Sequence, residues 1–288
     1  MRHVFSLGSA GAALFACILF VACAAGVAAD EAPRENAPTE VVPLNRAFAH
    51  NDYYHARPLF DALDRGFMHV ETDLFRIGDE LLVAHSQREI EADRTLQSLY
   101  LDPLLARVRE NDGRVYPGES RPFWLMIDFK TVGHETWPLV HEVLAEYAEM
   151  LTVVRDGELE PGPVRVVISG SRPIELMRQE RVLYAGVDGR ISDLQSNAPP
   201  ELMPWISDNW YVHFHWTGEG EMPEEEREKL SRIVEQVHAA GRRLRFWATP
   251  ERPALWRVLL EHDVDMLNTD RLEMLQQFLL EAEEQPTP

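Results

Sequence analysis

Apolar stretches rich in β-branched and aromatic residues alternate along the chain with stretches of helical periodicity. The first kind predicts strands, and apolar residues recurring every three or four positions predict helices. Strands are expected at 46–50, 67–74, 123–130, 164–170, 184–188, 211–216, 244–249 and 265–269. Helices are expected at 58–65, 137–150, 173–180, 223–240, 252–262 and 271–283.

This alternation is typical of parallel strands joined by crossover helices. Eight strands within about 225 residues favour a closed barrel over an open doubly wound sheet. We therefore predict an α/β fold in which residues 45–283 form a single (β/α)8 TIM barrel.

Residues 1–29 combine one early arginine, an apolar stretch and small residues suited to a signal-peptidase site, which predicts a secretory signal cleaved near Ala29. Gly and Ser within the apolar stretch disfavour a membrane anchor, so we expect no membrane span in the mature chain. The segment FVAC resembles a bacterial lipobox with Phe20 in place of Leu, which makes lipidation at Cys23 the alternative. Residues 30–44, rich in Pro and charge, predict a linker, and the location is expected to be secreted or periplasmic.

Both cysteines lie in the leader, so the mature chain is expected to have no disulfide. The net charge of −20 disfavours nucleic acid and anionic membranes as partners, because both would repel the chain. A bound divalent cation fits this charge better. The sequence gives no indication of the oligomeric state.

Acidic side chains share a face on two of the expected strands. Residues two apart along a strand point the same way, which places Glu71 with Asp73 and Asp128 with Lys130. The alternate residues are apolar and suited to lie under helices. Two carboxylates on a buried face repel each other unless a positive group lies between them. Three carboxylates without a thiol favour Mg²⁺, with Ca²⁺ or Mn²⁺ as alternatives, over zinc.

Two histidines are expected beside these carboxylates. His50 ends the first strand, and His85 follows a short hairpin arm after the second strand. In a β/α barrel the carboxyl ends of the strands form the active-site mouth. A metal ion and Lys130 that neutralise phosphoryl oxygens, with one histidine as base and the other as acid, would cleave a phosphodiester.

The segments AHNDY, VETDLF, LLVAHS, LMIDFKT and RFWATP…VDMLNTD resemble, in this order, the PLC-like phosphodiesterase superfamily. Within it the chain is similar to the glycerophosphodiester phosphodiesterase and sphingomyelinase D type of barrel, above all to the branch called altered inheritance of mitochondria protein 6. The resemblance implies a metal ion on Glu71, Asp73 and Asp128, and His50 and His85 as an acid/base pair. It also places Lys130 near the phosphate and Trp247 against the substrate.

The chain departs from the glycerophosphodiesterases where Asn51 and Asp52 follow His50 in place of Arg-Gly, and where Asp128 replaces a Glu. The substrate is therefore expected to be a small phosphodiester or a phospholipid-like head group, without a choice between hydrolysis and cyclisation. Asn51 is expected at the substrate-binding site, where it either orients His50 or fills the outer shell of the metal ion; the alternative is a turn residue. Ser169 either contacts substrate or packs at the surface.

Two alternatives stay open at this point. His213 and His215 form an H-x-H pair, which on one strand face could centre a metallohydrolase of amides or esters. The aromatic residues around the pair favour barrel lining or substrate contact instead. The second alternative is a barrel that binds a phosphorylated ligand without catalysis.

Overall fold

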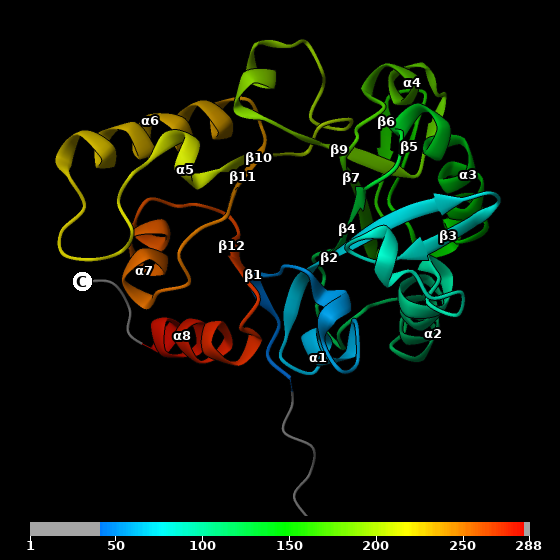
Figure 1. Cartoon of the computed structure of the whole chain (residues 1–288), viewed down its shortest axis with the longest axis horizontal. Coiled ribbons are helices and arrows are strands. Elements are labelled where there is room, and N and C mark those ends of the chain that lie inside the picture. The colour runs from blue at the N-terminus through cyan, green and yellow to red at the C-terminus, as the bar shows by residue number, and fades with distance from the viewer. Residues whose placement is uncertain (1–40, 285–288) are drawn as a thin grey trace, which may run out of the picture. The chain divides into compact units, whose positions relative to one another are not determined.

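The computed structural model describes residues 41–284, and its strands form a barrel surrounded by helices (Figure 1). The expected signal sequence at 1–29, Cys23 and residues 30–40 of the expected linker lie outside the described residues. Strand β1 begins at Leu44, the last residue of that linker. Within residues 41–284 no helix is both long and apolar enough to cross a membrane.

Eight parallel strands follow one another around the barrel in chain order. A single parallel bridge between Arg245 and Met266 links β11 to β12, so the barrel is nearly closed. This arrangement confirms the predicted TIM barrel. Its strands are β1 (Leu44–Ala49), β2 (Phe67–Ile77), β4 (Phe123–Phe129), β7 (Val164–Gly170), β9 (Ala185–Gly189), β10 (Trp205–Asn209), β11 (Arg243–Trp247) and β12 (Leu267–Thr269).

Helices pack around the strands, and an additional strand, β3 (Glu80–Val83), folds back antiparallel on β2. A separate small sheet contains β5 (Val153–Arg155), β6 (Glu158–Glu160) and β8 (Val182–Leu183). The α-helices are α1 (Phe60–Leu63), α2 (Asp102–Glu110), α3 (Gly133–Glu146), α4 (Ile174–Gln179), α5 (Trp210–His213), α6 (Glu224–Ala239), α7 (Pro253–Glu261) and α8 (Leu272–Glu284). Helix α2 was not among the expected helices.

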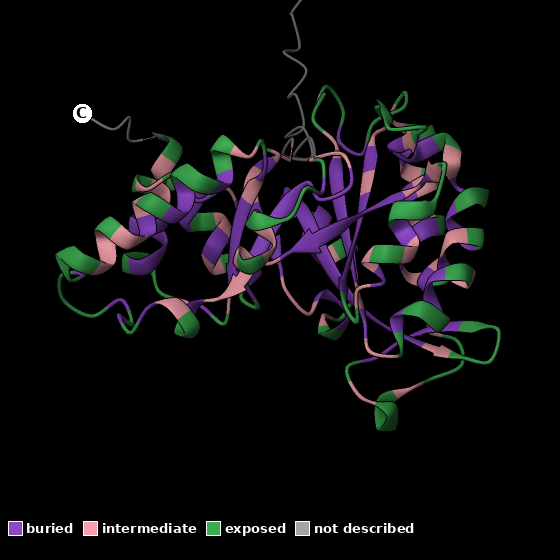
Figure 2. Ribbon diagram, turned by 90° about the horizontal axis from the view of Figure 1, so that it is seen from above, coloured by how far each residue is buried: buried purple, intermediate pink, exposed green. Residues whose placement is uncertain are grey.

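Two apolar layers hold the barrel together, and Figure 2 shows its buried strands between partly exposed helices. The outer layer lies between strands and helices and contains Val70, Leu125 and Ile127, as the alternation predicted. The barrel interior is filled by Phe48, Trp124, Met126, Val167, Trp205 and Met266. Phe48, Trp124 and Trp205 contact one another or His69 in this interior, and the His69 ring is buried among them.

The strand expected at 211–216 is wrong. The strand lies at Trp205–Asn209, and residues 210–213 form the short helix α5. The Asn209 side chain accepts a hydrogen bond from the backbone N–H of Tyr211 and caps this helix. Pro204 immediately precedes the strand, where the missing N–H is tolerated, although a proline more often indicates a loop.

Candidate active site

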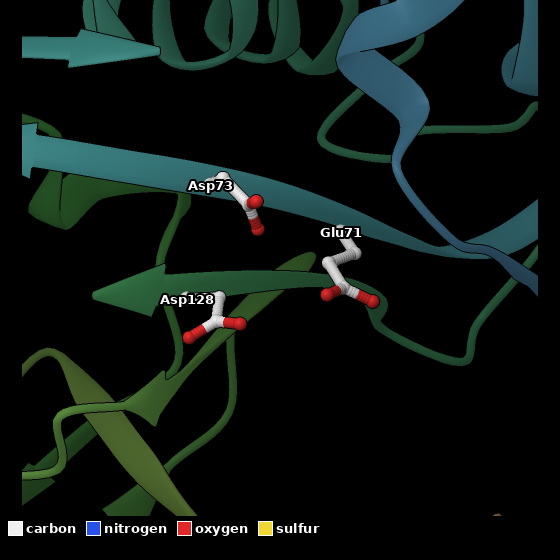
Figure 3. A group of neighbouring side chains, drawn as sticks. All are labelled: Glu71, Asp73 and Asp128. Atoms are coloured by element: carbon white, nitrogen blue, oxygen red, sulfur yellow. The ribbon is translucent and has the colours of Figure 1, made fainter. Parts of the chain in front are cut away.

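Three carboxylates converge on the inner face of β2 and β4 (Figure 3). The strands are paired so that Asp73 lies opposite Asp128, while Glu71 lies two residues before Asp73 on the same face. One oxygen from each residue lies within 4.8 Å of the other two. The convergence expected from the strand alternation is therefore observed.

Two cations offset the negative charge of this acidic triad. Lys130 Nζ lies 2.9 Å from an oxygen of Asp128 and 3.0 Å from one of Asp73. Arg245, which is buried inside the barrel, donates to Oε2 of Glu71 at 2.8 Å. Burial raises the pKa values of Glu71 and Asp73, and it outweighs the opposing effects of Arg245 on Glu71 and of Lys130 on Asp73.

Asp73 and Asp128 each have one carboxylate oxygen that is hydrogen-bonded and one that is free for a cation. Oδ2 of Asp73 is hydrogen-bonded to Tyr53, and it also lies within 3.0 Å of His85 and Lys130. Oδ2 of Asp128 accepts from Lys130. The remaining oxygen, Oδ1, is buried without a hydrogen-bond partner in both aspartates. Buried acceptors of this kind are costly unless something positive binds them, so the residues fit a divalent ion.

His50 is anchored through its Nδ1 atom. That atom lies 2.7 Å from Oδ1 of Asp270 and 2.8 Å from the Asn51 amide. The Nε2 atom lies 4.0 Å from Oε2 of Glu71, at the edge of the triad. Burial lowers the pKa of His50, but the carboxylates of Glu71 and Asp270 outweigh burial and the net shift is upward.

His85 is anchored in the same way. Its Nδ1 lies 3.0 Å from Oδ2 of Asp73 and 3.1 Å from the hydroxyl of Tyr53. That hydroxyl also lies 2.7 Å from Oδ1 of Asn51, so Tyr53 links the two histidine loops. In both histidines Nδ1 is engaged, and Nε2 is left for a ligand.

A cavity of about 300 Å³ joins these groups at the mouth of the barrel. Every residue that we expected at the site lines it except Asp73, which lies behind Tyr53 and Lys130. The lining residues are His50, Asn51, Glu71, His85, Met126, Asp128, Lys130, Ser169, Gly170, Asp188, Arg190, Arg245 and Trp247. A cavity of this size suits a small ligand.

The model of the AIM6-like phosphodiesterase domain matches residues 35–184, which is 150 of the 288 residues. The chain belongs to this family. It is 28% identical over 281 residues to an altered inheritance of mitochondria protein 6 homolog of Arthroderma benhamiae, covering 84% of the chain and 87% of that relative. It is 25% identical to altered inheritance of mitochondria protein 6 of Eremothecium gossypii, covering 83% and 70% respectively.

The fold has a counterpart among solved structures. A glycerophosphodiester phosphodiesterase from Parabacteroides distasonis superposes with a TM-score of 0.52 at 14% identity, over 84% of this chain and all of that one. That likeness concerns the fold alone. The AIM6-like match itself includes the triad, both histidines and Lys130, whereas Arg245, Trp247 and Asp270 lie beyond it.

Asp188, Arg190, Arg245 and Asp270 were not singled out as functional from sequence. Asp270 was noted only as a polar residue at a strand end, and for Tyr53 substrate contact and surface packing were both left open. Arg245 precedes Trp247 by two residues on β11, so the alternation that selected Trp247 would also have found it. Arg190 follows the end of β9, and only its side-chain contacts mark it as part of the site.

The hypothesis of a metal site at His213 and His215 is wrong. His213 ends helix α5 and approaches Asp208 at 3.2 Å, while His215 is exposed in the following loop, so the pair does not share a strand face. Among residues 41–284 the triad is the only group of three or more candidate ligands that converges. The neighbouring Trp210 and Phe214 pack on Phe246 in the layer outside the strands, so the alternative of barrel lining is also wrong.

Proposed function

We propose that this barrel is a divalent-metal-dependent phosphoric diester hydrolase in which His50 and His85 transfer the protons. One observation carries the proposal: two carboxylate-anchored histidines and three converging carboxylates meet at one mouth. The family match and the fold support phosphodiesterase chemistry at a coarser level. A small phosphodiester, such as a glycerophosphodiester or a phospholipid head group, fits the cavity volume.

Glu71, Asp73 and Asp128 would hold the ion, for which Mg²⁺ is the first candidate and Ca²⁺ or Mn²⁺ the alternatives. When bound, the ion supplies positive charge against the phosphoryl oxygens, which accumulate negative charge as the bond breaks. Lys130 contacts the carboxylates of Asp73 and Asp128 and adds a fixed positive charge beside the ion site. Burial lowers the pKa of Lys130, but the carboxylates of Asp128 and Asp73 outweigh it and keep the amine protonated.

The histidines complete the chemistry. The carboxylates of Asp270 and Asp73 favour the tautomer with hydrogen on Nδ1, so Nε2 of one ring can accept a proton from the nucleophile. The other ring, in its protonated form, delivers a proton to the leaving oxygen. Trp247 lines the cavity and is positioned to pack on the substituent of the substrate.

Turnover of bis(p-nitrophenyl) phosphate tests this proposal. We expect Mg²⁺-dependent release of p-nitrophenol that EDTA abolishes and that His50→Ala lowers by at least about 100-fold. His215→Ala removes an exposed histidine outside the cavity and serves as the matched control, with activity unchanged. Absence of turnover on a panel of diesters, or full activity in His50→Ala, would refute the proposal. Phosphorus NMR of the product separates hydrolysis from cyclisation.

A further inference from the structure

The wall of the cavity opposite His50 has no part in the proposed proton transfers. It is built by Ser169 at the end of β7, by Asp188 in β9 and by Arg190 just after β9. Strand β9 is four strands from β1 in both directions around the barrel, so these residues face the histidine across the mouth. All three line the cavity. They are therefore placed to contact the substituent of the diester rather than its reacting phosphorus.

Asp188, the acidic residue of this wall, is buried, and only one of its two carboxylate oxygens has hydrogen-bond partners. Asp188 is 1% exposed. Its Oδ2 accepts from Ser169 Oγ at 2.7 Å and from Arg190 Nη1 at 2.7 Å. Its Oδ1 is buried without a hydrogen-bond partner. An unpaired carboxylate on a cavity wall would attract a cationic ligand, but here Arg190 neutralises its charge.

The arginine itself is held in place. Besides Asp188, its Nη1 lies 3.0 Å from the carbonyl oxygen of Gly189, and its Nη2 lies 3.4 Å from Ser169 Oγ. The guanidinium is partly exposed at the cavity. A fixed guanidinium presents hydrogen-bond donors and a positive charge to whatever occupies this end of the cavity.

We propose that the pair formed by Asp188 and Arg190 determines specificity by excluding quaternary ammonium head groups and accepting uncharged, hydroxyl-bearing ones. This inference rests on the proposed phosphodiesterase function. A hydroxyl can donate to Oδ1 of Asp188 and accept from Arg190, which satisfies both partners. A trimethylammonium group can make neither hydrogen bond and is repelled by the guanidinium.

Three chromogenic diesters with one leaving group test the inference: p-nitrophenyl phosphocholine, p-nitrophenyl glyceryl phosphate and p-nitrophenyl ethyl phosphate. We expect the wild type to favour the glyceryl ester over the choline ester by at least about tenfold in kcat/KM. Arg190→Met leaves the carboxylate of Asp188 without its cation, so the choline-to-glyceryl ratio should rise by at least about tenfold. Arg190→Lys keeps the charge and should keep the wild-type order.

Arg172→Met is the matched control. Arg172 Nη1 donates to the carbonyl oxygen of Asp188 at 2.7 Å and pairs with Asp193, but it does not line the cavity. Its replacement should leave the ratio unchanged. If Arg172→Met shifts the ratio as much as Arg190→Met, or if the wild type cleaves the choline ester as well as the glyceryl ester, the inference is overturned.

Calorimetric binding of phosphocholine and glycerol phosphate to the same variants separates this inference from the proposed function. If no diester is cleaved, but the wild type prefers glycerol phosphate and Arg190→Met reverses that preference, the proposed function fails and the specificity pair stands. If diesters are cleaved and Arg190→Met leaves both the binding preference and the ratio unchanged, the specificity pair fails and the proposed function stands.

Discussion

His50 and Asp270 are 220 positions apart in the sequence, yet Nδ1 of the histidine lies 2.7 Å from Oδ1 of the aspartate. They follow β1 and β12, which are paired with Ala49 opposite Thr269. Closure of the barrel thus brings the first and last strands together and places a carboxylate behind the histidine. The carboxylate orients the ring, as in other paired histidine and carboxylate groups.

Asp270→Asn should therefore weaken catalysis without removing the site. We expect kcat to fall by about 10- to 1,000-fold, because the ring loses its orientation and its charge partner. Asp270 raises the pKa of His50, so the limb of the pH profile of kcat/KM that reports His50 should move to lower pH: the acidic limb if His50 is the base, the basic limb if it is the acid. Asp263→Asn removes an exposed partner of Arg46 and should change neither quantity. An unaltered pH profile in Asp270→Asn would contradict the role of this carboxylate.

Gly170 is required by the position of Asp128. A Cβ at residue 170 would lie 1.8 Å from Oδ1 of Asp128, and the backbone φ is +67°. Gly170→Ala should displace this carboxylate and weaken divalent-ion binding, measured by calorimetry, by at least about tenfold.

Gly118→Ala is the control for Gly170→Ala, since its φ is +75° but no atom lies within 4 Å of the added carbon. It should cost about 1 kcal/mol of stability and leave ion binding intact. Equal losses of ion affinity in the two variants would show that backbone strain, not the clash with Asp128, is responsible.

Asp52 makes the stability depend on pH. Burial raises its pKa from an ordinary 3.8 to about 7 in the folded chain. The unfolded chain loses this proton near pH 4, whereas the folded chain keeps it up to about pH 7. The free energy of unfolding that the protonated carboxyl contributes is therefore complete below pH 4 and is lost as the pH rises to about 7. Urea unfolding of the wild type and of Asp52→Asn should show the variant gaining about 2 to 4 kcal/mol relative to the wild type between pH 5 and pH 7.5. A constant difference across this range would contradict the assignment.

Arg245 stabilises the acidic interior. It is stacked 3.8 Å from the ring centre of Phe48 and hydrogen-bonded to Asn268 and Glu71. Arg245→Met leaves Glu71 unpaired, so we expect the free energy of unfolding in EDTA to fall by about 3 to 5 kcal/mol. The double variant with Glu71→Gln should lose less than the two single losses combined. Additive losses would show that the two residues are not coupled.

The sequence predicted the barrel because alternation marks parallel strands and places Glu71, Asp73 and Asp128 on interior faces. It failed at residues 211–216, where strand-like aromatic residues form a capped helical turn instead. The partners of the site residues were harder to predict. The contact of His50 with Asp270 depends on barrel closure, and that of Asp188 with Arg190 depends on side-chain conformations that no periodicity specifies.

Calorimetric titration of the protein with Mg²⁺ tests the central claim most directly. We expect one ion to bind the wild type and His213→Ala alike, and the affinity to fall by at least about 10- to 100-fold in Glu71→Gln, Asp73→Asn and Asp128→Asn. Retention of the ion by the three carboxylate variants, together with its loss in His213→Ala, would contradict the claim.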